Sequence, residues 1–330
     1  MLSKPKFVWL GVHSEKVLEI MRKNEPAELD VYYAHSKTDK LEHLELLKDA
    51  EYVSANGIKL TDEYIMAAPK LKLIQSWSAG TDAINTALLK ERGIALQNGV
   101  GFNAQAVAEM TVLLMLAANR YVSYVDRSVR KGKWLKVEMR EKCHSVYGKT
   151  IGLIGMGHIG RIVTKYVHGL DCKEVIYYDP FRLSEEEEQR LNVTYMPLEE
   201  VIRNADILSL HCPATPKTEK MIGKEQLASM KRDAILINTA RGKLVDEPAL
   251  IEALQNGTIR GAGLDTYSPE PPAADNPLFQ MDNVVLMSHG GGAVIENVEP
   301  RVKHVYDCCL AFERGEEIPK KYIVVPRPEN

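Results

Sequence analysis

One segment constrains the fold more than any other. In KTIGLIGMGHIGRIVTKYV a short apolar stretch, a glycine-rich turn and a helix-forming stretch follow one another without interruption. Gly155, Gly157 and Gly160 have the G-x-G-x-x-G spacing at the turn. Such a turn lets the backbone reverse tightly, approach a pyrophosphate closely and pack the following helix on the strand. The segment therefore predicts a parallel α/β sheet that binds a dinucleotide.

An acidic residue follows at the distance that such a sheet requires. Nineteen residues after Gly160, the strand-like run EVIYYDP ends in Asp179. A carboxylate there accepts hydrogen bonds from both ribose hydroxyls and repels a 2′-phosphate, which favours NAD over NADP. The alternative, a glycine-rich turn beside an unrelated surface acid, leaves the register of strand, turn, helix and acid unexplained.

Short apolar runs rich in β-branched and aromatic residues alternate with amphipathic stretches along the whole chain, which predicts an α/β protein. The expected strands are 7–12, 31–34, 52–55, 71–77 and 94–97 in a first sheet, and 150–154, 174–178, 207–211, 234–238, 261–264 and 284–287 in a second. A long apolar helix from residue 103 precedes the second sheet and is expected to be buried between two bodies, and a last helix at 296–314 follows that sheet. We predict two doubly wound parallel-sheet domains, a Rossmann NAD-binding domain (104–292) inserted into a flavodoxin-like substrate domain (1–103 and 293–330).

The charge and cysteine content of the chain limit the classes of molecule that it is expected to bind. The 42 basic and 45 acidic side chains leave a net charge of −3, so no strong field attracts nucleic acid or an anionic membrane. The five cysteines have no C-x-x-C spacing, which indicates neither a disulfide framework nor a zinc site. The apolar run near the N-terminus is too short for a signal peptide or a membrane span. We expect a cytoplasmic protein that acts on a small molecule.

Three polar residues follow the ends of later expected strands, where open α/β sheets bind ligands. Arg241 follows ILINTA, Glu270 lies in the proline-rich segment SPEPP, and His289 precedes three glycines. Each residue taken alone would be interpreted as having no catalytic role: Arg241 as a surface arginine, Glu270 as an acidic loop residue and His289 as a structural histidine. Together they supply a cation for a carboxylate, an acid–base group that titrates near neutral pH, and a carboxylate to orient it. Hydride transfer to a 2-keto acid needs this combination.

The order and spacing of several segments resemble the D-isomer-specific 2-hydroxyacid dehydrogenase family between about residues 50 and 310. The segments are VAEMTVLLMLAANR, GLIGMGHIGR, HCPATPKTEKMI, ILINTARGKLVDEPALIEAL, GAGLDTYSPEPP and SHGG. The resemblance implies an NAD-dependent oxidoreductase that acts on the CH–OH group of 2-hydroxy acids. It implies that Arg241 binds the substrate carboxylate, that His289 exchanges the proton and that Glu270 holds the imidazole.

The resemblance also implies a set of binding residues. For the cofactor they are Gly155, Gly157, His158, Ile159, Gly160, Asp179, His211, Cys212, Pro213, Thr218, Thr239, Ala240, Arg241, Asp265, His289 and Gly291. For the substrate they are Asn56, Gly57, Trp77, Ser78, Ala79, Gly80 and Arg241, with the amides of the IQSWSAGTD loop near the carboxylate. Gly290 stands where members usually have an aliphatic residue, so a looser loop or a wider pocket is expected, and Met110 stands where a histidine is common.

Several functions stay open within the resemblance. The substrate is expected to be small and unphosphorylated, because the loops 53–59 and 74–82 contain no arginine and one lysine. Glyoxylate, hydroxypyruvate, pyruvate and branched-chain keto acids all fit. Glu270 disfavours formate oxidation, since members with that activity have glutamine there. The alternatives are phosphite oxidation and an NAD-responsive corepressor-like binding protein. The resemblance further implies a homodimer whose arm, containing Trp134, crosses to the partner.

Overall fold

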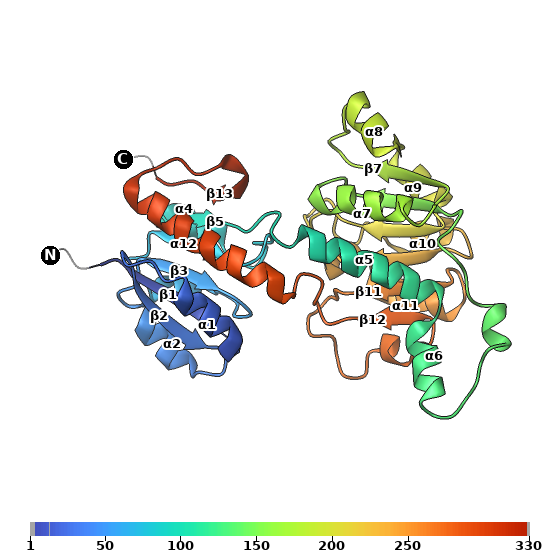
Figure 1. Cartoon of the computed structure of the whole chain (residues 1–330), viewed down its shortest axis with the longest axis horizontal. Coiled ribbons are helices and arrows are strands. Elements are labelled where there is room, and N and C mark those ends of the chain that lie inside the picture. Colours follow the sequence, from blue (N-terminus) through green and yellow to red (C-terminus); the bar gives the residue numbers. More distant parts are fainter. Residues whose placement is uncertain (1–3, 13, 329–330) are drawn as a thin grey trace. The chain divides into compact units, whose positions relative to one another are not determined.

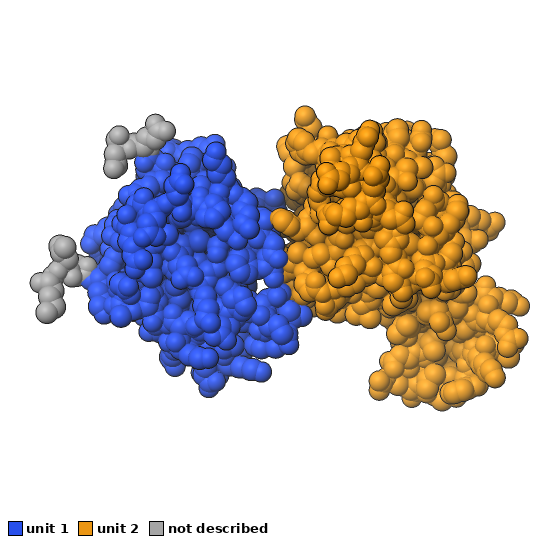
Figure 2. Space-filling view, turned by 45° about the horizontal axis from the view of Figure 1, so that its top comes forward, with its two compact units in different colours: residues 1–102, 294–330 blue, residues 103–293 orange. Residues whose placement is uncertain are grey.

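The structure is a computed structural model that describes residues 4–12 and 14–328. The chain divides into two compact units, Met1–Phe102 with Val294–Asn330, and Asn103–Ala293 (Figure 2). The predicted class, two parallel-sheet α/β domains, is confirmed. Among the described residues, no helix combines the length and the apolar character needed to cross a membrane.

Unit 1 is built on a six-stranded sheet with the order β13-β5-β4-β3-β1-β2. Its strands are β1 (Lys6–Val12), β2 (Asp30–His35), β3 (Tyr52–Ala55), β4 (Leu73–Ser76), β5 (Ala95–Gln97) and β13 (Ile323–Val325). Its helices are α1 (Glu15–Lys23), α2 (Lys40–Leu47), α3 (Asp62–Met66), α4 (Thr86–Glu91) and α12 (Val298–Arg314).

Both faces of this sheet are covered (Figure 1). Phe7 and Trp9 of β1 pack in a cluster with residues of α1 and α12, whereas Val8 and Leu10 pack with residues of α2, α3 and α4. Alternate residues of a strand point to opposite faces, so an entirely apolar strand is what a sheet buried on both sides requires.

Unit 2 is built on a seven-stranded parallel sheet with the order β12-β11-β10-β9-β6-β7-β8, the Rossmann order with one strand added. The strands are β6 (Thr150–Ile154), β7 (Glu174–Tyr178), β8 (Val193–Tyr195), β9 (Ile207–Leu210), β10 (Ile235–Asn238), β11 (Gly261–Leu264) and β12 (Val284–Leu286). The helices are α5 (Ala104–Asn119), α6 (Val122–Val129), α7 (His158–His168), α8 (Glu185–Leu191), α9 (Leu198–Asn204), α10 (Lys224–Ser229) and α11 (Glu247–Gln255). Unit 2 also contains the short 3-10 helices η1 (Glu138–Arg140), η2 (Gly242–Leu244) and η3 (Pro277–Gln280), whereas η4 (Ile295–Asn297) and η5 (Lys320–Tyr322) belong to unit 1.

Two short strands and a helix break differ from the sequence-based expectation. β8 and β13 have three residues each, and β13 pairs with β5 in the antiparallel sense. The long helix expected from residue 103 is divided into α5 and α6 at Tyr121, whose φ is +53°. At this break Asn119 donates to the Met115 carbonyl and accepts from Arg260 of the loop before β11. This tertiary contact overrides the local helical preference.

Candidate active site

The glycine-rich turn joins β6 to α7 at the middle of the unit 2 sheet, and packing demands two of its glycines. Gly155 has a φ of +102°, and a Cβ atom there would lie 2.7 Å from the backbone carbonyl of His211. A Cβ on Gly160 would collide with the carbonyl oxygen of Gly155. At Gly157 the same atom would meet nothing within 4 Å. The protein itself therefore does not require glycine at 157, and the backbone there faces open space.

The N-terminus of α7 opens into the same space. Gly157 is the N-cap residue and has no side chain to cap the helix, so the first amides, at His158 and Ile159, have no intrahelical acceptor. A pyrophosphate can accept hydrogen bonds from the free amides at such a helix N-terminus, and the glycine lets it come close to the backbone. The residues present therefore fit a dinucleotide.

Asp179 follows β7 and lies beside this turn. Its Oδ2 atom accepts the amide of Met156 at 2.8 Å, and its Oδ1 atom accepts the amide of Phe181 at 2.9 Å. These bonds fix the carboxylate at the edge of the turn. Two arginines of the neighbouring segments are paired with glutamates of α8: Arg182 makes two 2.9 Å bonds to Glu188, and Arg161 pairs with Glu187.

Four of the predicted cofactor residues, His211, Cys212, Pro213 and Thr218, follow β9. Burial lowers the pKa of His211 to about 4, so the imidazole is neutral, and its buried Nδ1 atom has no hydrogen-bond partner in the described structure. Burial likewise raises the pKa of the Cys212 thiol to about 11. The Thr218 hydroxyl donates to the Pro213 carbonyl at 2.7 Å and closes the turn. These groups are therefore uncharged at neutral pH and suit an uncharged aromatic base.

Arg241 stands in a tight turn after β10 that one buried side chain organises. Asn238 donates to the Arg241 carbonyl at 2.9 Å and accepts the Ala240 amide at 3.1 Å. The Arg241 guanidinium donates to the Ala240 carbonyl at 2.8 Å. The Thr111 hydroxyl donates to the carbonyl of Val107, so the 2.8 Å contact between Thr239 and Thr111 is a bond that Thr239 donates.

This turn packs directly on the segment that carries Glu270. A Cβ on Gly242 would collide with the backbone of Tyr267, so only glycine allows the two segments to meet. The Tyr267 amide donates to Glu270 Oε1 at 2.8 Å, and its hydroxyl donates to the Met287 carbonyl at 2.6 Å. The peptide bonds before Pro269 and Pro271 are cis.

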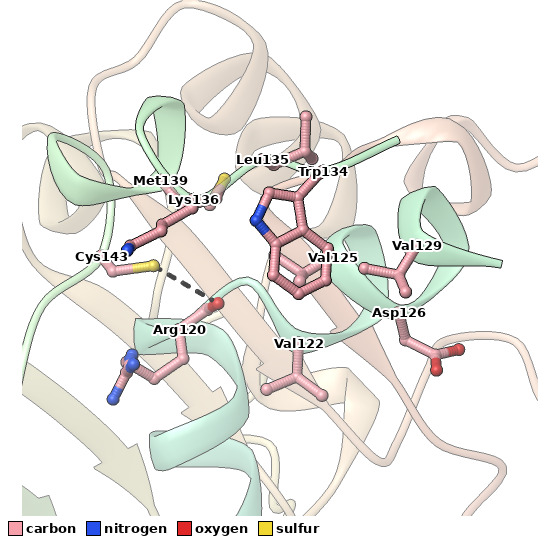
Figure 3. A pocket seen from close by; sticks show the side chains of 10 residues that line it. All are labelled: Arg120, Val122, Val125, Asp126, Val129, Trp134, Leu135, Lys136, Met139 and Cys143. Carbon is pink, nitrogen blue, oxygen red and sulfur yellow. Dashed lines mark hydrogen bonds between the residues drawn. The ribbon is translucent and has the colours of Figure 1, made fainter. Parts of the chain in front are cut away.

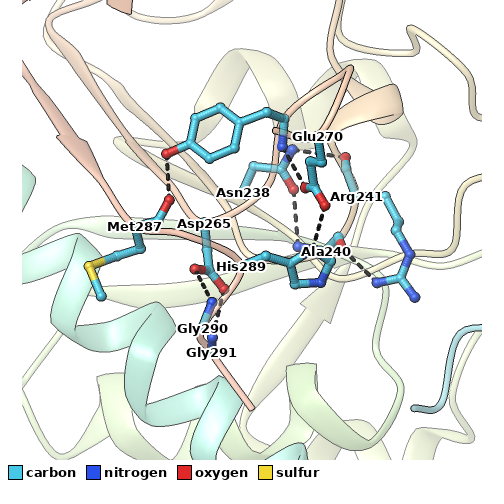
Figure 4. A network of polar contacts seen from close by, with 10 residues as sticks. Asn238, Ala240, Arg241, Asp265, Glu270, Met287, His289, Gly290 and Gly291 are labelled. Atoms are coloured by element: carbon cyan, nitrogen blue, oxygen red, sulfur yellow. Dashed lines mark hydrogen bonds and ion pairs between the residues drawn. The ribbon is translucent and has the colours of Figure 1, made fainter. Parts of the chain in front are cut away.

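Glu270 and His289 form a pair (Figure 4). The His289 Nδ1 and Glu270 Oε2 atoms are 2.7 Å apart. The hydrogen bond to Glu270 raises the pKa of His289, and this effect outweighs the opposite effect of burial. Burial alone would raise the pKa of Glu270, but the bonds from His289 and from the Tyr267 amide hold it below its usual value. The pair therefore favours an ionised carboxylate and a protonated imidazole.

Asp265 holds the backbone around His289. Its Oδ1 and Oδ2 atoms accept the amides of Gly290 and Gly291 at 2.8 Å each, and its carbonyl accepts the His289 amide at 2.8 Å. Asp265 is 1% exposed. His289 itself has a φ of +55°, which few residues other than glycine adopt. The amides of Gly290 and Gly291 are therefore both held by Asp265, and the wider pocket expected from the three glycines stays a prediction.

The predicted substrate loop lies in unit 1, after β4. The carbonyls of Ser78 and Ala79 point inward, where they accept the Gly99 amide at 3.2 Å and the Asn98 side chain at 3.0 Å. The Gly80 carbonyl accepts the Ser78 hydroxyl at 2.8 Å within the loop. No described residue accepts from the amides of 78–80.

The other predicted substrate residues lie at the ends of strands in the same unit. Trp77 packs on Trp9, with the ring centroids 5.7 Å apart. Asn56 and Gly57 follow β3, and Gly57 turns the chain with a φ of +71°.

Sequence reasoning missed four residues that shape these groups: Asn238, Tyr267, Asn98 and Arg301. All are polar residues beside a strand end or on the apolar face of a helix. Only Arg301 carries a readable signal, because it lies three residues after Val298 and four before Val305 on the buried face of α12.

Comparison with known proteins decides the family. The model of the D-isomer specific 2-hydroxyacid dehydrogenase NAD binding domain matches residues 112–291, more than half of the chain. The chain belongs to this family. It is therefore an oxidoreductase that acts on the CH–OH group of 2-hydroxy acids.

Individual family members are similar over most of their length. The glyoxylate reductase of Korarchaeum cryptofilum is 40% identical over 293 residues, which are 88% of this chain and 87% of that protein. The structure of the NAD-dependent formate dehydrogenase of Staphylococcus aureus in complex with NAD has a TM-score of 0.86 at 26% identity. The match covers 98% of this chain and 100% of that chain. The NADPH-dependent glyoxylate/hydroxypyruvate reductase of Sinorhizobium meliloti has a TM-score of 0.81 at 26% identity, with 98% and 99% covered.

Proposed function

We propose that this 2-hydroxyacid dehydrogenase reduces a small, unphosphorylated 2-keto acid with NADH, giving a D-2-hydroxy acid. The observation that carries the proposal is the 2.7 Å contact between His289 Nδ1 and Glu270 Oε2, with the other Glu270 oxygen fixed by the Tyr267 amide. A carboxylate on Nδ1 leaves Nε2 of the imidazolium to hold the proton that the forming alkoxide needs.

The residues divide the chemistry between them. When bound, the nicotinamide supplies the hydride. Arg241 binds the substrate carboxylate and polarises the C2 carbonyl, since its planar guanidinium can donate to two oxygens at once. His289 gives its proton to the alkoxide oxygen, and Glu270 keeps the imidazole charged and oriented. In the oxidation direction the same imidazole accepts the proton.

The proposed preference for NADH rests on the surroundings of Asp179. A 2′-phosphate on the adenosine ribose would be repelled by this carboxylate. Arg182 and Arg161 are the cations that could offset the repulsion, and both are engaged by glutamates of α8. Because a similar reductase of Sinorhizobium meliloti is NADPH-dependent, family membership alone leaves the choice of cofactor open, and Asp179 decides it in this proposal.

The proposed substrate class rests on the loops after β3 and β4. They offer amides at 78–80 and no arginine, which suits a carboxylate but supplies no guanidinium for a phosphate. The 40% identity to a glyoxylate reductase supports a small keto acid such as glyoxylate, hydroxypyruvate or pyruvate.

The test is NADH oxidation with glyoxylate, hydroxypyruvate, pyruvate and a branched-chain keto acid, compared with phosphohydroxypyruvate. Turnover of at least one unphosphorylated acid, with D-lactate formed from pyruvate if pyruvate reacts, supports the proposal. His289→Asn should abolish it. His35→Asn, a change at an exposed histidine of unit 1, is the matched control and should leave it unchanged. Absence of turnover with all these acids would refute the proposed activity.

We further propose a homodimer formed through the arm of unit 2, comprising α6 and the loop that follows it. The arm leaves the body of the unit (Figure 1) and encloses an apolar hollow of about 560 Å³ (Figure 3). Trp134 beside it is 77% exposed, and Val122 and Val129 are about half exposed. Leu113 and Leu116 of α5 are also exposed, and we propose that a second copy covers them together with the arm.

Sedimentation at micromolar concentration tests the homodimer. A dimer of the wild type and a monomer of Trp134→Glu are expected, with Tyr147→Glu, another change at an exposed aromatic residue, as control. A monomeric wild type would refute the homodimer.

A further inference from the structure

Arg301 of α12 is a buried arginine beneath the loop after β4, and it is 2% exposed. Its Nη2 atom donates to the Ser76 carbonyl, and its Nε atom donates to the Trp77 carbonyl at 3.0 Å. Its Nη1 atom is buried and has no hydrogen-bond partner among the described residues. Nor does any described carboxylate form an ion pair with it. A buried guanidinium without a counter-charge is energetically costly, which indicates that Arg301 has a role beyond packing.

The groups around Arg301 do not neutralise it. Burial lowers the pKa of Arg301 to about 10, so it remains a cation at neutral pH. Burial lowers the pKa of His304 to about 4 and raises that of Cys308 to about 11, so both are uncharged. The Phe102 ring lies 5.5 Å from the guanidinium. A Cβ on Gly99 would lie 2.6 Å from the guanidinium carbon, so glycine there leaves room for it.

Peptide geometry links Arg301 to the amides of the loop. In a trans peptide the C=O and the following N–H point in opposite directions. A Trp77 carbonyl held inward by Arg301 therefore turns the Ser78 amide outward. By the same rule the inward carbonyls of Ser78 and Ala79 turn the amides of Ala79 and Gly80 outward. Hydrogen bonding at each carbonyl also polarises the amide of the same peptide.

We infer that Arg301 is a positioning residue for the substrate carboxylate, setting the loop amides and supplying the buried cation that faces the bound anion from below. The inference rests on the proposed function, because the carboxylate belongs to the keto acid. Arg301 does not touch the substrate; it acts through the peptides that follow Ser76 and Trp77. The substrate carboxylate is then the counter-charge that the unliganded unit lacks.

The test compares Arg301→Met, which removes charge and donors, with Arg301→Lys, which keeps the charge. Arg92→Met is the matched control, because Arg92 also donates to two backbone carbonyls in unit 1, those of Ile65 and Ala68. Arg301→Met should raise KM for the keto acid by about 10-fold to 100-fold, the effect of losing one hydrogen bond to a charged group. The values of kcat and of the NADH dissociation constant should change less than about threefold, and Arg301→Lys should lie between.

Two readouts separate positioning from mere folding. Binding of oxalate, followed by calorimetry, should weaken in parallel with KM, and hydrogen exchange at residues 77–81 should accelerate in Arg301→Met but not in Arg92→Met. If Arg301→Met does not fold, Gly99→Ala, which pushes the guanidinium aside without removing it, should show the same rise in KM.

Unchanged KM and oxalate binding in folded Arg301→Met or Gly99→Ala, or an equal rise in Arg92→Met, would overturn the inference. If the wild type turns over no keto acid, the proposed function fails separately. Oxalate binding and loop exchange then decide whether Arg301 orders an anion-binding loop.

Discussion

Replacing Asp265 by asparagine tests whether the backbone around His289 is held for catalysis. In the native chain each carboxylate oxygen accepts one amide, from Gly290 and from Gly291, at 2.8 Å. Asparagine has nearly the same shape, but one oxygen becomes an NH₂ group. The NH₂ group is a hydrogen-bond donor, so it cannot accept the backbone amide that the carboxylate oxygen accepted, and two donors would face each other. The variant keeps one neutral bond and loses the charge.

The size of the effect follows from these two contacts. A hydrogen bond to a charged group contributes about 1.5–3 kcal/mol. Asp265 is 1% exposed, so water does not replace the lost acceptor. A loss of about 2 kcal/mol lowers the population of the native loop by up to roughly 30-fold, since about 1.4 kcal/mol corresponds to a factor of ten. We expect kcat/KM for keto-acid reduction to fall by about 10-fold to 30-fold.

The assay is steady-state kinetics with thermal unfolding measured in parallel. Asp265→Asn should lower Tm by several degrees, because about 1 kcal/mol shifts Tm by roughly 2–4 °C in a domain of this size. Asp282→Asn, at an exposed carboxylate paired with Arg127 in the same unit, is the control and should change neither quantity appreciably. A lower Tm with unchanged kcat/KM would refute the argument, because Asp265 would then stabilise the fold without positioning His289.

Three further substitutions test separate parts of the account. Arg241→Lys should retain NADH binding but lose roughly 100-fold in kcat/KM, because a point charge replaces the planar fork; near-normal turnover would make Arg241 structural. Asp179→Ala should improve kcat/KM with NADPH relative to NADH, and wild-type NADPH activity equal to that with NADH would already contradict the assignment to the ribose. A Cβ at Gly290 meets nothing within 4 Å, so Gly290→Ile should fold normally and lower kcat/KM for branched-chain keto acids more than for glyoxylate; an equal loss for both would remove Gly290 from substrate selection.

Local sequence patterns predicted the bounds of those strands whose apolar runs are flanked directly by polar or turn-forming residues. Tyr52–Ala55, Thr150–Ile154, Glu174–Tyr178 and Gly261–Leu264 have the bounds that their apolar runs predicted. These runs are buried on both faces, so periodicity and flanking turn residues agree. The contact between Glu270 and His289 also agrees with the relation inferred from the sequence, although the catalytic roles of the two residues stay predictions.

The remaining features depend on contacts between distant residues. β13 forms only because Ile323 and Val325 find β5, more than 200 residues earlier. Helix α5 ends where Asn119 meets Arg260, and nothing in the run of apolar residues announces this contact. Asp265 was predicted only as a cofactor-binding residue, whereas its hydrogen bonds to Gly290 and Gly291 depend on where β11 and β12 lie. The sequence alone suggests that Gly290 and Gly291 are flexible, because it does not show that the Asp265 carboxylate accepts their amides.

The dependence of kcat/KM on pH tests the central claim, that Glu270 tunes His289 for proton transfer. Reduction needs the imidazolium, so the rate should fall as pH rises through the pKa of His289, which Glu270 raises. In Glu270→Gln the charge that stabilises the imidazolium is gone, so the alkaline limb of log kcat/KM for keto-acid reduction should move to lower pH, with a smaller loss at acid pH than at neutral pH. An alkaline limb at the same pH in the wild type and in Glu270→Gln would contradict the account.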